Sequence, residues 1–337
     1  MKIPRTRISQ IFAALCLIML TLPACAQNQV ADKPLFRDPV FDGAADPVVI
    51  WNAAEKKWFM FYTNRRAGAE GLDGVTWVHG TRIGIAESSD NGLTWQYRDT
   101  CDIRYRPVEN YTHWAPEVIE YDGTYHMYLT YVPGVFADWN HPRNIVHLTS
   151  KNLINWDYQS TLSLANDKVI DACVFRKPDG TWRMWYNNEK DGKSIYFADS
   201  EDLYHWEDRG KAVGDQSGEG PKVFFWKDDY WMVTDVWDGL GLYKSDDLEG
   251  WVRIPENLVK EPGKGADDGV KGGHPDVVIS GERAFLFYFT HPGRIEAIPD
   301  SNWYEKRRSS IQVVELFYDN GRLVCNRDEP TRIFLKP

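Results

Sequence analysis

The sequence predicts an all-β fold, a five-bladed β-propeller, and three observations lead to this prediction. Helical periodicity is scarce, and after the N-terminal segment no unbroken apolar run exceeds the length of an ordinary strand. A three-part unit recurs five times along the chain. Equivalent points of successive units lie 69, 56, 49 and 54 residues apart, counted from Asp46 to Ala115, Asp171, Gly220 and His274, and this period is typical of propeller blades.

Each unit begins with a short turn that leads into a strand, and an aromatic strand follows. The first parts read ADPVVI, WAPEVI, IDACVF, EGPKVF and GHPDVV. The second parts read WFMFYT, YHMYLTY, WRMWYN, YWMVTD and AFLFYF, and a glycine or charged turn precedes each. Turns of this kind between two strands predict β-hairpins.

The third part of a unit is a strand that ends in a turn and a tryptophan. Four copies end in Trp95, Trp156, Trp206 and Trp251, which we expect to be structural, and the fifth copy, from Ile311, lacks the tryptophan. Five such units fill residues 27–337 as one domain. A β-sandwich is the alternative, but sandwiches do not repeat a three-part signature at this period.

Residues 1–26 are predicted to be a secretory signal peptide. Basic residues precede an apolar run from Ile11 to Leu22, which is too short to span a bilayer. Small residues around Ala26 allow cleavage before Gln27, whereas the sequence ending in Cys25 resembles a lipobox that would make Cys25 a lipid anchor. We expect an exported protein, periplasmic or extracellular, with no membrane span, and free secretion is favoured.

Composition limits the kinds of binding partner that the protein is expected to have. The formal charge is −10, and an acidic surface repels phosphate backbones, so nucleic acid is not an expected partner. Aromatic residues make up 14% of the chain, which suits the faces of sugars. Of the cysteines after residue 26, Cys101, Cys173 and Cys325, none has the close spacing of a metal site or a disulfide framework.

Chemistry is expected where the innermost strands of the blades begin, because these points converge on one funnel around the propeller axis. The residues there are Asp46, His113 with Trp114, Asp171, Glu219 and His274. Three carboxylates in an aromatic-lined funnel are what glycosidic hydrolysis requires. Taken singly, Asp46 and Glu219 fit turn caps equally well, Trp114 fits core packing, and His274 fits a hydrogen-bonded turn residue.

The ordered motifs DP, WAP, D, EGP and HP resemble glycoside hydrolase family 43 and its five-bladed relatives in families 62, 32, 68 and 117, from about Asp42 to Gly293. The resemblance implies that Asp46 is the general base, that Asp171 tunes pKa and orientation, and that Glu219 is the general acid, with inversion at the anomeric carbon. It also implies a calcium or other ion on the axis near His274, and no organic cofactor.

Substrate contacts are expected on blade two and on a long insertion in blade one. The insertion runs from Asn64 to Arg82 and is expected to emerge near the funnel. The predicted contacts are Arg65, Arg66, Trp77, His79, His113 and Trp114. If the arginines face inward, an anionic sugar becomes a candidate substrate.

Several functions remain open at this point. A pentosidase, either an α-L-arabinofuranosidase or a β-xylosidase acting on plant or algal saccharides, is the first choice, and a galactosidase of the family 117 type is the alternative. A retaining enzyme like those of family 32 usually has Asn where Ala45 stands. A sialidase is suggested by the turn from Ser88 to Trp95 but would need six blades. A non-catalytic sugar-binding propeller would not need three converging acids.

Overall fold

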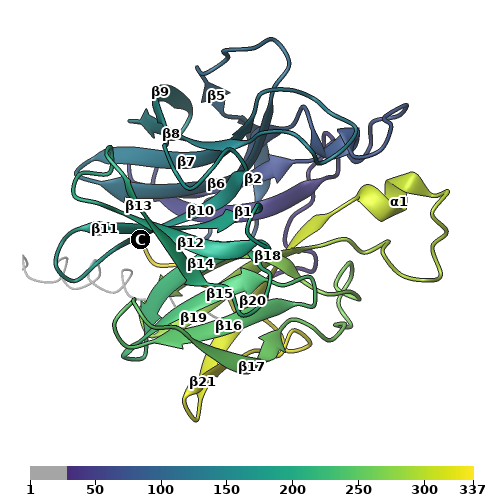
Figure 1. Cartoon of the computed structure of the whole chain (residues 1–337). Helices are drawn as coiled ribbons and strands as arrows, with labels where there is room; N and C mark the ends of the chain where they lie inside the picture. The colour runs from purple at the N-terminus through teal and green to yellow at the C-terminus, as the bar shows by residue number, and fades with distance from the viewer. Residues whose placement is uncertain (1–28) are drawn as a thin grey trace, which may run out of the picture.

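The computed structural model describes residues 29–337, and it confirms the predicted all-β five-bladed propeller (Figure 1). The predicted signal peptide and Cys25 lie outside the described residues. None of the helices in the described part of the chain is long and apolar enough to cross a bilayer.

Each blade is an antiparallel sheet whose strands follow one another in chain order. Blade one has β1 (Ala44–Asn52), β2 (Lys57–Asn64), β3 (Arg82–Ser88) and β4 (Gln96–Thr100). Blade two has β6 (Thr112–Tyr121), β7 (Thr124–Val132), β8 (Asn144–Ser150) and β9 (Asn155–Thr161), with the short β5 (Asp102–Ile103) parallel to β9 at its outer edge. Blade three has β10 (Val169–Arg176), β11 (Trp182–Asn188), β12 (Ser194–Ser200) and β13 (Glu207–Val213).

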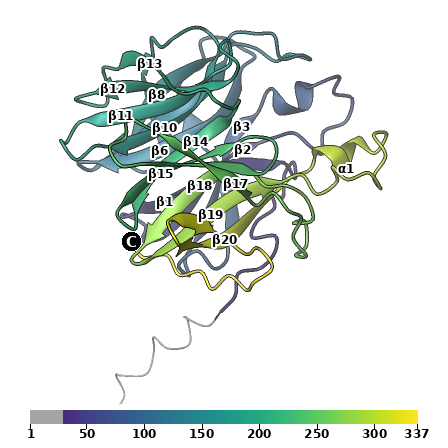
Figure 2. The same cartoon turned by 60° about the horizontal axis from the view of Figure 1, so that its bottom comes forward.

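The last two blades complete the ring. Blade four has β14 (Glu219–Trp226), β15 (Asp229–Asp235), β16 (Leu240–Ser245) and β17 (Val252–Leu258). Blade five has β18 (Gly273–Ser280), β19 (Arg283–Thr290), β20 (Ser310–Asp319) and β21 (Arg322–Val324). A short helix, α1 (Trp303–Arg307), stands out from the body in the connection between β19 and β20 (Figure 2).

Burial explains why the strands of one blade differ in sequence. The second strand of a blade lies between two neighbouring blades, so both of its faces are covered, and all seven residues of β11 are buried. The outermost strand has one free face, and β13 accordingly alternates between exposed and partly buried residues. The aromatic runs therefore mark the second strands, while polar alternation marks the edges.

The innermost strands share an unusual backbone feature at their first turn. Asp46, Ala115, Asp171, Gly220 and His274 all have positive φ angles, between 38° and 59°, and the register with the second strand shifts at each of these places. Such a bulge bends the strand and re-aims a side chain. Four of the five positions are not glycine, so the surrounding fold must stabilise a conformation that L-residues rarely adopt.

Four tryptophans join neighbouring blades, as expected of structural residues. Each packs edge-to-face on the fourth residue of the preceding blade's aromatic strand. The pairs are Trp95 with Phe287, Trp156 with Phe61, Trp206 with Tyr128 and Trp251 with Trp185, at 5.4–6.4 Å between ring centroids. The equivalent residue of blade four is Val233, and it packs with Leu316 and Leu323 in the core next to blade five.

Candidate active site

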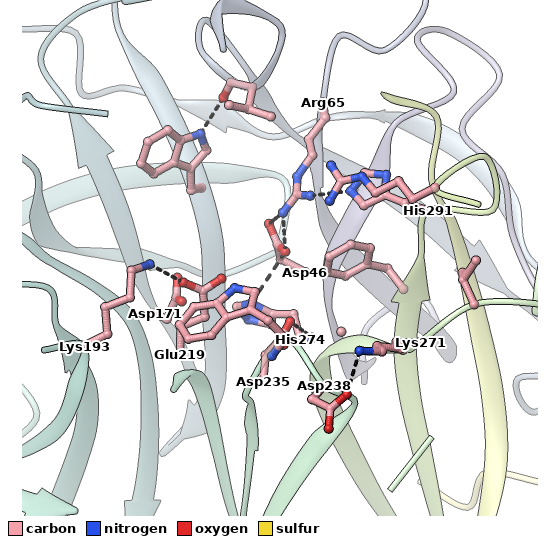
Figure 3. Close-up of a pocket in the computed structure, with 18 of the residues that line it drawn as sticks. Asp46, Arg65, Asp171, Lys193, Glu219, Asp235, Asp238, Lys271, His274 and His291 are labelled. Atoms are coloured by element: carbon pink, nitrogen blue, oxygen red, sulfur yellow. Dashed lines mark hydrogen bonds and ion pairs between the residues drawn. The ribbon is translucent and has the colours of Figure 1, made fainter. Parts of the chain in front are cut away.

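A cavity of about 1040 Å³ opens where the innermost strands begin. All five blades contribute to its wall. The contributions at the strand heads are Asp46, Trp114, Asp171, Glu219 and His274, as the sequence predicts for a funnel on the axis. Figure 3 shows Asp46, Asp171, Glu219 and His274 in the cavity. The recurring bulge therefore brings residues that are far apart in sequence into one site.

Asp46 is a buried carboxylate with a fixed cationic neighbour. Arg65 Nη2 donates to both of its oxygens, at 2.8 and 3.1 Å, and His274 Nδ1 lies 3.5 Å from Oδ1. Burial raises the pKa of Asp46, but the charge of Arg65, the neighbouring His274 and hydrogen bonds from Thr63 and Arg65 outweigh burial and hold the pKa below its ordinary value. Asp46 is therefore ionised at neutral pH, as a general base must be.

Arg65 is itself held in place from two sides. Its Nη1 lies 3.1 Å from His291 Nε2, and its guanidinium lies over the ring of Phe289, 4.7 Å from the centroid. Both contacts come from the end of β19 and the segment after it. The predicted inward orientation of Arg65 is present, but its charge is directed at Asp46.

Asp171 has the opposite electrostatic character. Its Oδ2 accepts the backbone N–H of Gly220 at 3.1 Å, and its own N–H donates to Thr130 Oγ1 at 3.1 Å. Burial and the negative charges of Glu219 and Asp46 raise its pKa well above the ordinary value. Asp171 therefore keeps its proton under conditions in which Asp46 has lost its own.

Glu219 contacts a lysine that the sequence analysis did not single out. Lys193 Nζ donates to Glu219 Oε2 at 2.9 Å and lies 3.5 Å from an oxygen of Glu189 (Figure 3). The lysine also lies over the ring of Trp237, 4.8 Å from the centroid. Glu219 and Lys193 thus form the wall across from Asp46 and Arg65.

Steric contact with His274 explains why the EGP motif has a glycine at position 220. Gly220 has φ +55°, and a Cβ at this position would lie 2.8 Å from His274 Nδ1. The imidazole of His274 therefore rests on the backbone of Gly220. Burial lowers the pKa of His274, so the ring is neutral at neutral pH.

Asp235 is a further cavity carboxylate that the sequence reasoning missed. Its Oδ1 accepts the backbone N–H of Trp237 at 2.8 Å, and its Oδ2 accepts that of His274 at 3.0 Å. Burial and the charge of Glu219 raise its pKa to about 7. The signal was present in YWMVTD, because Asp235 aligns with Thr63 and Thr130, which accept the N–H of the next blade's head residue in the same way.

Three of the six predicted substrate contacts line the cavity. These are Arg65, Trp77 and Trp114, and Trp114 is held by a bond from its Nε1 to the carbonyl oxygen of Val78 at 2.6 Å. The short helix η2 (Thr76–Val78) brings the insertion to the cavity, as expected.

The prediction fails for the other three contacts, which do not line the cavity. Arg66 donates to the carbonyl oxygens of His79 and Thr76 at 2.7 and 2.6 Å, so it ties the insertion together. His79 is fully buried behind Trp114, with 4.9 Å between the ring centroids. His113 is buried beside Tyr111 and Tyr131.

Two exposed tryptophans flank the mouth of the cavity, and neither was predicted as a site residue. Trp139 is 53% exposed and Trp237 is 46% exposed, and both line the cavity. Trp237 has φ +56°, which the bond from its N–H to Asp235 stabilises. Exposed indole faces beside a carboxylate-rich cavity offer stacking surfaces for sugar rings.

The protein that this fold and cavity define is an enzyme of the glycoside hydrolase class. A family model described as "Probable glycosyl hydrolase domain" and related to family 43 matches residues 36–260. The chain belongs to this family-43-related glycosyl hydrolase family, which confirms the resemblance seen in the motifs. A search of curated proteins found no match.

Solved structures share the fold at low sequence identity. A thermostable family-43 glycoside hydrolase is 20% identical, with TM-score 0.63, covering 88% of this chain and 97% of that chain. A family-43 β-1,3-galactosidase with galactodeoxynojirimycin is 14% identical, with TM-score 0.62, covering 88% and 98%. A β-xylosidase/α-arabinofuranosidase from a compost microbial metagenome, with xylotriose in a calcium-free form, is 15% identical, with TM-score 0.57, covering 83% and 93%.

The residues around His274 do not fit the metal ion that the resemblance implies. Calcium takes six to eight oxygen ligands. In residues 29–337 no group of three or more His, Cys, Asp or Glu side chains could hold a metal ion. His274 Nδ1 faces Asp46, and the nearby carboxylates Asp46 and Glu219 are directed at Arg65 and Lys193.

Proposed function

We propose that the enzyme is an exported inverting glycosidase that removes terminal sugars from plant or algal saccharides. The observation that carries the proposal is the opposite electrostatic state of two carboxylates in one cavity. Asp46 is held ionised by Arg65, whereas Asp171 retains a proton beside Glu219. An inverting glycosidase needs an ionised base that activates water, a role that fits Asp46, and a proton source for the leaving oxygen, a role that we assign to Glu219 beside Asp171.

The roles follow from the contacts. Asp46 accepts a proton from the attacking water, and Arg65 and His274 hold its carboxylate in one orientation. Glu219 donates a proton to the departing oxygen, and Lys193, 2.9 Å from Glu219 Oε2, stabilises the carboxylate that this step forms. Asp171 keeps a proton next to Glu219 and so limits the negative charge around the acid.

The first-choice substrate is a terminal pentose, either α-L-arabinofuranose or β-xylose. The insertion supports a neutral sugar, because Arg65 is paired with Asp46 and Arg66 is turned to backbone carbonyls, so neither offers a free charge. A galactosidase is the second candidate. Structures of similar fold are described both as a β-xylosidase/α-arabinofuranosidase and as a β-1,3-galactosidase, so both substrate types belong in the first assay.

One residue favours an acidic group elsewhere on the glycan. Arg294 lines the cavity, donates from Nε to the Lys306 carbonyl at 3.3 Å, and forms no ion pair within the part of the chain that the structure describes. A carboxylate or sulfate on a sugar near the mouth would find a partner there. Arg294→Gln would then reduce a preference for acidic over neutral oligosaccharides and leave hydrolysis of neutral aryl glycosides unchanged.

The test combines a substrate panel with two variants. The purified protein is assayed on aryl pentosides, aryl hexosides and oligosaccharides, and NMR follows the anomer that forms first. Glu219→Gln is expected to lose about 10²–10⁴-fold in kcat/KM on natural glycosides but much less on aryl glycosides with good leaving groups. Asp46→Asn is expected to lose activity on both, since water must be activated in either case.

The control and the contrary outcomes are specific. Asp319→Asn, at an exposed position outside the cavity, should retain full activity. A product of retained configuration would make Asp46 a nucleophile and overturn the inverting mechanism. Sugar binding without turnover on any substrate would favour the sugar-binding propeller instead.

A further inference from the structure

A lysine lies at the centre of the propeller, one layer below the cavity carboxylates. Lys222 stands two residues after Gly220 on β14, and Glu117 and Asp276 hold the equivalent positions on β6 and β18. Lys222 Nζ lies 2.8 Å from Asp276 Oδ1 and 3.1 and 3.3 Å from the two oxygens of Glu117. Blade three separates blades two and four around the ring, so an ammonium that reaches both Glu117 and Asp276 must lie near the axis.

The two carboxylates also contact the remaining blades. Glu117 Oε1 accepts the N–H of Val174 in blade three at 3.2 Å. Asp276 Oδ2 accepts the N–H of Val49 in blade one at 2.8 Å. Glu117 and Asp276 are 4% and 2% exposed. Three charged side chains thus connect all five innermost strands beneath the site.

We propose that Lys222 is a built-in cation that takes the place of an axial metal ion, so that the enzyme needs no metal for stability or activity. Its ammonium neutralises Glu117 and Asp276, the carboxylates that would otherwise offer oxygen ligands on the axis. A divalent ion bound there as well would lie beside a fixed positive charge. The residues around His274 offer no alternative set of ligands in the described chain.

The wild-type arm of the test measures Tm with excess EDTA and with added CaCl₂. Neither is expected to change Tm by more than about 1 °C, since the cation is covalently part of the chain. The kcat/KM on the best substrate should also be the same in EDTA and in calcium. The Tm measurement does not depend on the proposed activity, so the two proposals can fail separately.

The variant arm removes the ammonium and then its partners. Lys222→Ala is expected to lower Tm by about 5–15 °C, because two buried carboxylates lose their counter-charge. Calcium should restore part of this loss, because Glu117 and Asp276 then become available as ligands. The triple variant Glu117→Gln, Lys222→Ala, Asp276→Asn should show no response to calcium. Lys227→Met is the control. Lys227 is exposed, pairs with Glu282, and lies in the β14–β15 hairpin that also carries Lys222, so its loss should leave Tm unchanged.

Lys222→Met keeps the volume of the side chain and serves if the alanine variant does not fold. A Tm that falls in EDTA and recovers in calcium for the wild-type protein would overturn the proposal outright. An unchanged Tm in both Lys222→Met and Lys222→Ala would also overturn it, because the ammonium would then have no role on the axis.

Discussion

Asp46, Asp171 and Asp235 are all buried in one cavity, yet their neighbours push their pKa values in different directions. Arg65 outweighs burial at Asp46, whereas Asp171 and Asp235 each face the negative charge of Glu219. At neutral pH these carboxylates therefore carry fewer negative charges than there are carboxyl groups. Because the groups interact, the pH dependence that an experiment measures belongs to all of them together and not to one residue.

Lys193 is the residue whose removal best tests this coupling. The ammonium contacts Glu219 at 2.9 Å, and its charge also lowers the pKa of the neighbouring Asp171. With Lys193→Met the pKa of Asp171 should rise further, so the alkaline limb of the kcat/KM profile should move to higher pH. The measurement is a pH profile on a substrate with a poor leaving group.

Lys190→Met is the matched control. Lys190 is exposed, lies outside the cavity lining and pairs with Asp167. Its profile should overlay that of the wild-type protein. An alkaline limb that stays in place in Lys193→Met would show that the lysine does not act on the protonation of Asp171.

The head residues of the repeat were predictable from sequence, whereas the alternation of side chains along a strand explains the wrong placement of His113. Asp46, Asp171 and Glu219 occupy the recurring first turn, so topology alone brings them together. His113 precedes Trp114 on the same strand, and successive side chains point to opposite faces, so only Trp114 reaches the cavity. Lys193 and Trp139 lie in connections whose course no strand period determines.

At the scale of elements, the four inter-blade tryptophans explain how separate sheets become one ring. Their signal in sequence was strong, because each closes the same turn of a repeat. The short β5 and α1 carried no such signal, since the first is a two-residue strand and the second a single turn of helix in a long connection. Repetition predicts the blades, whereas unique insertions remain unpredicted.

Trp156 should contribute more to stability than Trp206. Trp156 is fully buried against Phe61, whereas Trp206 is only partly buried against Tyr128. Trp156→Ala is expected to lose about 3–5 kcal/mol through lost burial and the cavity left behind, and Trp206→Ala clearly less. Thermal unfolding measures both, and Trp139→Ala at the cavity mouth is the control with unchanged Tm. Equal losses in Trp156→Ala and Trp206→Ala would contradict this order.

At the scale of the whole molecule, the cavity carboxylates should make stability depend on pH. The folded-state pKa of Asp235 is raised from 3.8 to about 7, so the folded protein binds more protons than the unfolded chain between these values. The contribution of Asp235 to stability is therefore present in full below about pH 4 and is lost as pH rises toward about 7. Asp171, with its pKa raised as well, acts in the same direction.

This linkage predicts a Tm that falls between about pH 5 and pH 7 more steeply in the wild-type protein than in Asp235→Asn. The amide cannot ionise, so its contribution does not change over this range. Tm measured in buffers of matched ionic strength gives both slopes, and Asp319→Asn at an exposed site should keep the wild-type slope. Parallel slopes in wild type and Asp235→Asn would show that Asp235 does not hold a proton in the folded state.

Closure of the ring depends on contacts between the two ends of the described chain and the first and last blades. Phe36 pairs with Ile311 in blade five, and Leu335 donates its N–H to the carbonyl of Asn91 in blade one at 2.8 Å. Leu335 is fully buried, and a Cβ on Gly92 would lie 2.7 Å from its Cδ1. The turn from Ser88 to Trp95 therefore serves as the docking point for Ile333 and Leu335.

Leu335→Ala should weaken this closure between blades five and one. Loss of a fully buried leucine is expected to lower Tm by about 5–10 °C, and Gly92→Ala should act in the same direction because its φ of +85° and its contact with Leu335 both disfavour a Cβ. Lys336→Ala, one residue further along and exposed, should change Tm by less than about 1 °C. If Leu335→Ala behaved like Lys336→Ala, the ring would be closed by strand pairing and inter-blade packing alone, and the segment after Thr331 would have no part in it.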